Sequence, residues 1–132
     1  IIVFTEKFSL INAKNTTTPS FINGIPPIRF EHGLLFKNQP SGKIPKLKLH
    51  LSMLQVLKQK RYNEGTDYQA PPQGFVLFNM LMSSTLNTPK NLDIFLSIDN
   101  ILNTQYRNYL NRFRYFSDEI GRMTTIGLHY KF

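Results

Sequence analysis

Residues 123–132 alternate between apolar and polar positions along their whole length. One side of an extended chain would carry Thr124, Ile126, Leu128, Tyr130 and Phe132. The other side would carry Met123, Thr125, Gly127, His129 and Lys131. Because successive strand side chains point to opposite faces, this stretch predicts a strand with one apolar face and one largely wet face. An apolar strand face with aromatic residues at its end is typical of a transmembrane β-barrel, where Tyr130 and Phe132 would lie at the membrane interface.

Five further segments have the same two-residue period and are predicted as strands: residues 1–12, 28–37, 46–61, 74–86 and 91–102. In the third of these, Leu47, Leu49 and Leu51 alternate with lysines and a histidine. In the first segment, the adjacent Glu6 and Lys7 leave open which side is the apolar one. All eight prolines fall between the segments, where a missing backbone donor does no harm to a strand ladder.

One residue breaks the pattern of segment 28–37. His32 shares its side of the strand with Phe30 and Leu34, which is an awkward place for an imidazole if that side meets lipid. Two explanations stay open: His32 lies at the membrane interface, or a bulge shifts the register.

The predicted connections alternate in length. Residues 13–27, 62–73 and 103–122 are long, whereas 38–45 and 87–90 are short. An antiparallel meander places successive connections at opposite ends of the sheet, so all the long ones are expected at one end. Outer-membrane barrels have this asymmetry, with short periplasmic turns and longer extracellular loops.

Composition excludes several classes of protein. The 132 residues contain no cysteine, which rules out a disulfide framework and cysteine-based zinc sites. The longest apolar run, residues 74–82, is interrupted by Asn79 and is too short for a membrane helix. The net charge of +8 raises the possibility of nucleic-acid binding, but the basic residues do not gather in one helix or glycine-rich loop. We therefore expect no nucleic-acid partner.

Residues 99–106, Asp-Asn-Ile-Leu-Asn-Thr-Gln-Tyr, followed by a long loop and by Gly121-Arg122 before the last strand, resemble the end of a TonB-dependent outer-membrane receptor. That family commonly closes its penultimate strand on a DNLLN-x-x-Y run and finishes its last strand in Phe. Gly24-Ile25-Pro26-Pro27-Ile28-Arg29-Phe30 is similar to the IPPxRF start of the strand five before the end. The resemblance covers most of the chain and is strongest over residues 91–132.

The resemblance implies an all-β fold: residues 1–132 would be an antiparallel six-strand meander, the C-terminal part of a barrel of about 22 strands with a plugged lumen. Receptors of this family import scarce nutrients across the outer membrane of Gram-negative bacteria, most often ferric siderophores or other iron chelates. The implied partners are the plug domain and upstream strands of the same receptor, the TonB energy-transducing complex, outer-membrane lipid and the barrel assembly machinery. Leu128, Tyr130 and Phe132 would form the family's C-terminal assembly signal.

The residues themselves indicate neither an enzyme nor a cofactor or metal site. His50 and His129 share the wet side but belong to non-adjacent strands, and no histidine has a second ligand at metal-binding spacing. Asp93 and Asp99 are about 20 Å apart along a strand, which is too far for paired acid–base chemistry. No nucleophile elbow or phosphate-binding loop is present.

The loop 103–122 carries the candidate ligand contacts, in which arginines alternate with aromatic residues: Arg107, Tyr109, Arg112, Arg114 and Tyr115. Arginine and tyrosine together suit an anionic, partly aromatic ligand such as a ferric catecholate. The alternative is structural, with the arginines paired to Asp118 and Glu119 and the aromatics packing the loop.

We expect this chain to be part of an outer-membrane transporter. Two alternatives from other classes stay open: a structural or adhesive module that assembles a composite barrel from several chains, and a soluble six-stranded ligand-binding barrel. Gly33 and Gly127, both on the wet side, are expected to let the plug or a neighbouring side chain approach the sheet closely.

Overall fold

The computed structural model describes residues 1–18, 20–39, 45–86 and 92–130. These residues form an all-β fold with one long sheet and one two-stranded ribbon. The long sheet contains β1 (Ile2–Ser9), β4 (Arg29–Lys37), β5 (Lys46–Val56), β6 (Phe75–Leu86), β7 (Leu92–Asp99) and β8 (Met123–Tyr130). The ribbon pairs β2 (Lys14–Asn15) with β3 (Ser20–Phe21), and the 3-10 turn η1 spans Arg112–Tyr115. No helix among the described residues is long and apolar enough to cross a membrane.

All six predicted strands are present, but three end earlier than their sequence pattern indicated. The predicted strand 46–61 ends at Val56. Gln59 there is buried, and its side-chain amide donates to the carbonyl of Ile25. The strand predicted to reach residue 102 ends at Asp99, because Asn100 and Asn103 adopt positive φ angles of 52° and 54°. The strand predicted over 1–12 ends at Ser9.

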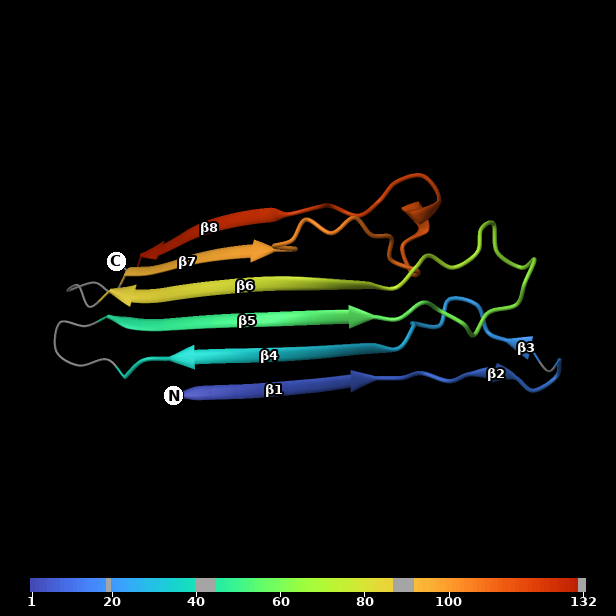
Figure 1. Ribbon diagram of the computed structural model, residues 1–132, viewed down its shortest axis with the longest axis horizontal. Coiled ribbons are helices and arrows are strands. Elements are labelled where there is room, and N and C mark those ends of the chain that lie inside the picture. Colours follow the sequence, from blue (N-terminus) through green and yellow to red (C-terminus); the bar gives the residue numbers. More distant parts are fainter. Residues whose placement is uncertain (19, 40–44, 87–91, 131–132) are drawn as a thin grey trace.

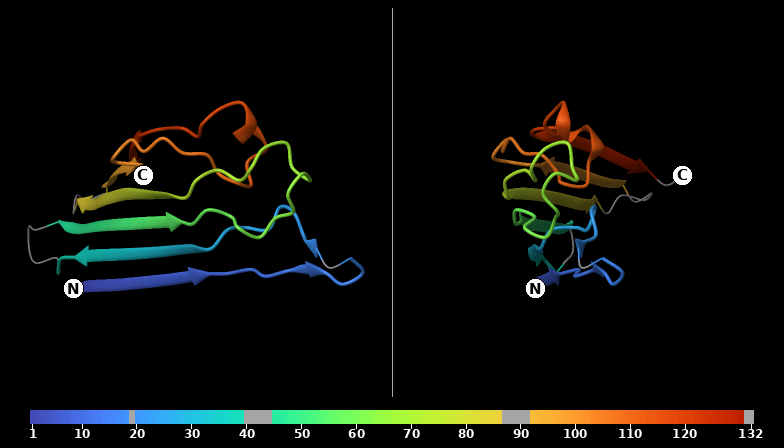
Figure 2. Two further views of the ribbon diagram at one scale, coloured as in Figure 1. Left: turned by 45° about the vertical axis from the view of Figure 1, so that its right-hand side comes forward. Right: turned by 90° about the vertical axis from the view of Figure 1, so that its right-hand side faces the viewer.

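The long sheet is an antiparallel meander in the order β1-β4-β5-β6-β7-β8 (Figure 1). Strands β1 and β8 lie at its two edges, and no ladder joins them among the described residues. Figure 2 shows an open, twisted sheet one layer thick. The predicted antiparallel six-strand meander is therefore confirmed, and among the described residues it does not close on itself.

The register brings the predicted apolar positions of all six strands into common rows. One such row runs Phe4, Leu34, Leu51, Met80, Ile98 and Thr124. The next row runs Ile2, Phe36, Leu49, Met82, Leu96 and Ile126. We call the face that carries these rows the apolar face. The opposite, polar face carries rows such as Lys37, Lys48, Ser83, Phe95 and Gly127.

The apolar face has no cover within the described part of the chain. On this face Ile126 is 72% exposed, Leu128 70% and Phe4 61%. Among the described apolar side chains only Leu77 and Tyr109 are buried, and neither belongs to this face. A contiguous apolar surface of this extent marks contact with a membrane or another protein. The sheet consequently lacks a core of its own.

The position of His32 is resolved without a bulge. Every residue of β4 has a partner on β1 or β5 in an uninterrupted ladder, so His32 does lie on the apolar face. Its cross-strand neighbour on β1 is Glu6, and the His32 Nδ1 atom is 3.4 Å from the Glu6 Oε1 atom. This pairing also settles the parity of the first strand: Glu6 shares the apolar face with Phe4 and Phe8, while Lys7 lies on the polar face opposite Glu31.

Both glycines of the polar face are covered by neighbouring side chains. A Cβ atom at Gly33 would contact Thr5 Oγ1 and would lie 3.0 Å from His50 Nε2. A Cβ atom at Gly127 would collide with the ring of Phe95, its direct cross-strand partner. An aromatic ring laid over a cross-strand glycine shields the backbone hydrogen bonds of an edge strand. Close approach of a neighbouring side chain, one of the two expected uses of these glycines, is thus confirmed.

This arrangement predicts that β8 tolerates a side chain at position 127 only when Phe95 is truncated. Gly127→Ala should lower the free energy of unfolding by about 1–3 kcal/mol, because the methyl group displaces the ring. In a Phe95→Ala background the same change should be neutral to within about 0.5 kcal/mol. Denaturant titration of the refolded protein measures both, with Thr125→Val on the same face as the matched control. Equal costs in the two backgrounds would contradict the prediction.

Candidate ligand-binding surface

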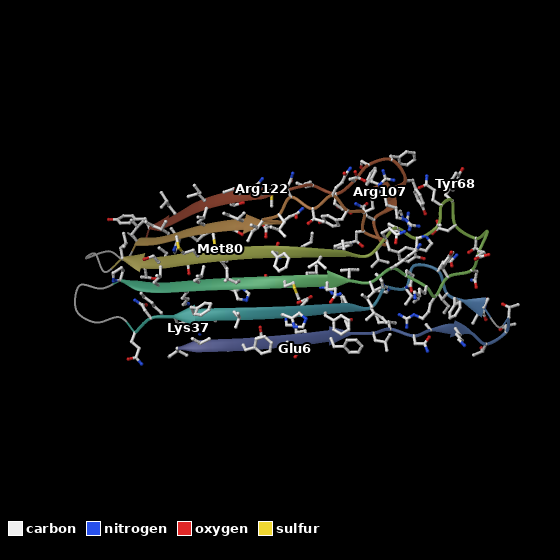
Figure 3. The ribbon with its side chains drawn as sticks, in the orientation of Figure 1. Glu6, Lys37, Tyr68, Met80, Arg107 and Arg122 are labelled. Carbon is white, nitrogen blue, oxygen red and sulfur yellow. The ribbon has the colours of Figure 1, made fainter. Side chains whose placement is uncertain are left out.

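Three long connections meet at one end of the sheet: residues 10–28, 57–74 and 100–122 (Figure 1). The end of β4 and the start of β5 lie at the other end of the sheet, with the N-terminus and the end of β8. The predicted position of the long connections at one end is thus confirmed, whereas the short connection 38–45 in part and the turn 87–90 as a whole lie outside the described residues. In Figure 3, Tyr68 and Arg107 lie at the end with the long connections.

Side-chain amides join the first connection to the second. The backbone N–H of Phe21 donates to Asn63 Oδ1 (3.0 Å), and Asn63 Nδ2 donates to the carbonyl of Phe21 (2.6 Å). The amide of Asn23 donates to Thr66 Oγ1 at 2.8 Å. The two bonds with Asn63 satisfy the backbone N–H and carbonyl of Phe21 in β3, and the Asn23 bond adds a side-chain contact between the same two connections.

A buried arginine joins the second connection to the third. Arg114 has a side-chain exposure of 6% and is hydrogen-bonded and ion-paired to the carboxylate of Asp67. The hydroxyl of Tyr115 donates to the other oxygen of Asp67. The guanidinium carbon of Arg114 lies 4.5 Å from the centre of the Tyr109 ring and 4.6 Å from that of the Tyr115 ring. The cation is therefore held between two aromatic faces and one carboxylate.

Local structure explains why Arg114 points inward. Residues 112–115 form the 3-10 turn η1, whose first free N–H, that of Phe113, donates to the Asn111 side chain at 2.9 Å. The amide of Asn111 also donates to Glu119 at 2.7 Å. The tight turn exposes Arg112 and Phe113 and places Arg114 against the other loops.

The start and end of the third connection are fixed by further polar contacts. Asn100 is buried and exchanges two 2.8 Å hydrogen bonds with the backbone of Thr104. Arg107 is hydrogen-bonded through Nε to Asp118, and its Nη1 donates to the carbonyl of Arg114 at 3.0 Å. The loop is thus folded back on itself rather than extended.

These contacts shift the proton affinities of the loop carboxylates. Burial raises the pKa of Asp67, but hydrogen bonds from Tyr115 and Arg114 outweigh burial and leave that pKa below its ordinary value. The hydrogen bonds from Arg107 and Gln105 hold the pKa of Asp118 below its ordinary value. Both carboxylates are therefore charged at neutral pH.

The structure brings four of the five predicted ligand contacts to one cavity. Tyr109, Arg112, Arg114 and Tyr115 line a cavity of about 340 Å³, together with Asp67 and parts of the first connection. Arg107 lies instead at a separate cavity of about 360 Å³, beside Asp118 and Tyr106. Sequence reasoning missed Asp67, because a lone acid 47 residues upstream of Arg114 has no local pattern that announces the contact.

Two guanidinium groups at the 340 Å³ cavity have unused hydrogen-bonding capacity. Arg112 is exposed, and Nη1 of Arg114 is buried without a hydrogen-bond partner. An anionic group in the cavity could accept from the exposed Arg112, which is consistent with the ligand hypothesis for this loop. The structural alternative also has support, since Arg107 is paired with Asp118 as that alternative expected. The ligand role of the five residues stays a prediction.

The remaining candidates are widely separated. Leu128 and Tyr130 lie exposed on the apolar face of β8, and Phe132 lies outside the described residues. Two strands separate His50 on β5 from His129 on β8. The Nδ1 atom of His129 lies 3.7 Å from the Oδ2 atom of Asp93. In the described ranges, no three histidine or acidic side chains gather closely enough to hold a metal ion.

Comparison with known proteins does not assign this chain to a family. A scan against protein-family models, a search of curated proteins and a search of solved structures each found no match. The function must therefore be argued from the geometry and the sequence pattern.

The Asp67–Arg114 contact predicts an acid-sensitive loop. The folded pKa of Asp67 is depressed, so its contribution to loop order is present above the unfolded value of 3.8 and is lost as the pH falls through the folded pKa. Asp67→Asn should release the loop at neutral pH, at a cost of about 1.5–3 kcal/mol, or about ten- to a hundredfold faster amide exchange over 103–122. Hydrogen-exchange mass spectrometry, corrected for intrinsic rates, measures this effect.

Glu64→Gln is the matched control for this experiment, since Glu64 is exposed in the same connection. Its exchange should follow that of the unaltered protein at every pH. Unchanged protection of 103–122 in the Asp67→Asn variant would show that the contact does not hold the loop.

Proposed function

We propose that this chain is the C-terminal part of a TonB-dependent transporter of the outer membrane, and that the intact protein imports a ferric siderophore or another iron chelate. The observation that carries the proposal is the uncovered apolar face, which extends over all six strands of a meander with two open edges. In such a barrel this face would meet lipid, and the edges would pair with upstream strands of the same protein.

The tilt of the apolar band supports the proposal. Its centre lies at Leu128 on β8 and at Glu6 on β1; through the cross-strand pairs, Leu128 is level with Leu47 on β5, whereas Glu6 is level with Met53. The two levels differ by about six residues, or roughly 20 Å, over five strand spacings of about 24 Å in total. The band therefore crosses the strands as if they were inclined by about 40° to a membrane normal, which is the tilt of transmembrane barrels.

The polar face fits a plugged lumen. Its rows carry Lys48, His50, Ser52 and Asn79, which need water or a polar filling. In the proposed barrel the plug domain supplies part of that filling and connects to the TonB energy-transducing complex. The end with the three long connections would face the outside of the cell, and the other end the periplasm.

The substrate class is supported by charge chemistry alone. The net charge of +8 and the exposed Arg112 beside two tyrosines suit an anionic chelate with aromatic groups. The proposal assigns no chemical step to this chain, so the activity is transport and not catalysis. Insertion would depend on the barrel assembly machinery, which would recognise the end of β8.

The open sheet argues against one of the two alternatives, the soluble barrel, but not against the other, the composite barrel. A soluble six-stranded barrel requires closure, whereas β1 and β8 do not pair among the described residues. A composite barrel built from several copies fits the open edges as well as a receptor does. The proposal requires upstream strands and a plug in the intact protein, whose length separates these two readings.

Transport is tested by deleting the gene for the intact protein and measuring growth of the source organism under iron limitation. A ferric catecholate, a ferric hydroxamate and haem are supplied in turn as the iron source. Loss of growth on one of them, restored by the gene, is the expected result. Two results together would overturn the proposal: wild-type growth of the deletion strain on all iron sources, and absence of the protein from the outer-membrane fraction of the parent strain.

The two faces should respond differently to charge. Ile126→Arg, Leu128→Arg, Leu49→Arg and Ile94→Arg lie on the apolar face, and each should cost about 2–4 kcal/mol near the bilayer midplane. Thr125→Arg and Ser97→Arg lie on the polar face and should be tolerated. Unfolding titrations in lipid vesicles measure the change in the free energy of unfolding for both groups of variants. Equal losses on the two faces would indicate a buried protein core instead of a lipid-facing surface.

The proposed assembly signal predicts an assembly defect. Phe132→Ser should lower the amount of intact protein in the outer membrane several-fold, because Phe132 forms part of that proposed signal. Blotting of membrane fractions measures it, with Lys131→Ser as the control. Wild-type levels of the Phe132→Ser variant would show that this residue is no part of an assembly signal.

A further inference from the structure

The polar face of the long sheet changes character along its strands. Near the long connections, the ring of Phe75 packs against that of Tyr106, with the ring centres 4.4 Å apart. Leu77, two residues along β6, is 7% exposed, whereas Leu81, four residues further on the same face, is 42% exposed. The third connection thus packs on one half of the polar face, and the apolar side chains of the other half are open.

One row of the open half is largely apolar. It runs Val3, Leu35, His50 and Leu81 across four strands. Val3 is 36% exposed and Leu81 42%. A wall that met only water would favour polar residues in such a row. Exposed apolar side chains bordered by charged ones are typical of a surface that another polypeptide covers.

Three lysines border this row. Lys37 and Lys48 are direct cross-strand partners in the next row of the same face, and Lys46 lies two residues along β5, about 7 Å away. Lys37 lies at the end of the sheet opposite to Tyr68 (Figure 3). Like charges directly opposite each other destabilise an antiparallel pair, since their Cβ atoms are only about 5 Å apart. A negative partner would relieve this repulsion. We call Lys37, Lys46 and Lys48 the lysine patch.

The described residues supply no acid to the lysine patch. None of its three lysines forms an ion pair with another described residue. The acid at the level of Lys46 is Asp93, and β6 separates the two. The sequence of 38–45 and 87–91 contains no aspartate or glutamate either.

Basic side chains at the other end of the polar face do have an acid. Glu31 forms ion pairs with Lys7 of β1, at 3.6 Å between Nζ and Oε2, and with Arg29 of its own strand. The sheet thus balances its own charges beside the long connections and leaves them unbalanced at the lysine patch.

We propose that the lysine patch and the adjoining row from Val3 to Leu81 form the docking surface for an acidic polypeptide segment. Carboxylates of the segment accept hydrogen bonds from the lysine ammonium groups, and an apolar side chain of the segment covers Leu35 and Leu81. An extended segment spaces alternate side chains about 7 Å apart, which matches Lys46 and Lys48.

The docking surface rests on the proposed function, in which the polar face lines the lumen, and it names the chemistry of the segment that fills this end of the lumen. Membrane lipid is not the occupant, because in that barrel lipid lies against the opposite, apolar face.

The test measures the access of N-ethylmaleimide to this surface in isolated outer membranes that contain the intact protein. Residues 1–132 contain no cysteine, so Leu81→Cys is a single reporter once any cysteine elsewhere in the protein is replaced by serine. Its labelling, relative to the rate in urea-unfolded protein, should be at least tenfold slower than that of Thr125→Cys. Thr125 is the matched control because it lies in the same row, two strands away. Equal rates at the two positions would overturn the proposal.

Charge variants separate an acidic segment from any other cover. Lys46→Glu together with Lys48→Glu should raise the labelling rate at position 81 at least tenfold, and the corresponding pair of changes to Gln at least threefold. Lys60→Glu should leave the rate unchanged, since Lys60 is an exposed lysine of the second connection. The variants should keep the wild-type membrane level, because each relieves the repulsion with Lys37. Slow labelling that none of the lysine variants changes would refute an acidic occupant.

Carbodiimide treatment of the same membranes identifies the segment, since it joins a lysine amine to a carboxylate in contact with it. Peptide mass spectrometry should find Lys46 or Lys48 joined to an aspartate or glutamate outside residues 1–132. Lysine-dependent protection of position 81 without such a link would assign the patch to a phosphate-bearing occupant and refute the proposal. Absence of the intact protein from the outer membrane refutes the proposed function, whereas labelling and cross-linking still test docking in the fraction that contains the protein.

Discussion

An apolar face without a partner governs this structure. The six strands pair in order along the chain, which fixes the register and thereby gathers the alternating apolar residues of neighbouring strands into common rows on one side. A one-layer sheet cannot bury that side against itself, so folding of this chain depends on something outside the described residues. In the proposed transporter, lipid would cover the apolar face and further strands of the barrel would pair with the two edges.

Strand positions and face assignment were predictable because both follow from a two-residue period. That period is strong in β4, β5, β7 and β8, and ladder pairing preserves it from one strand to the next. Strand ends were less predictable: Gln59 is hydrogen-bonded to Ile25 in another connection, and Asn100 is hydrogen-bonded to Asn79 of β6 and to Thr104. A local pattern carries no information about those partners.

The loop cluster shows the same limit more clearly. The alternation of arginine and aromatic residues in 103–122 marked the right segment, and four of its five candidates do line one cavity. The carboxylate that holds Arg114 comes from a different connection, and nothing in the sequence around Asp67 distinguishes it from an ordinary surface acid. Likewise, the Glu6–His32 pair became visible only when the register set two separate irregularities side by side.

The three long connections are joined to one another by two kinds of contact. Neutral amides of Asn63 and Asn23 hold the first connection to the second, while a buried charge pair holds the second to the third. Neutral hydrogen bonds are indifferent to ionic strength, and a pair as enclosed as Arg114 and Asp67 is screened far less than a surface pair. We therefore expect the loop end of the sheet to keep its shape across a wide range of salt concentrations, whereas acid should weaken the Asp67–Arg114 contact and leave the amide contacts of Asn63 and Asn23 intact.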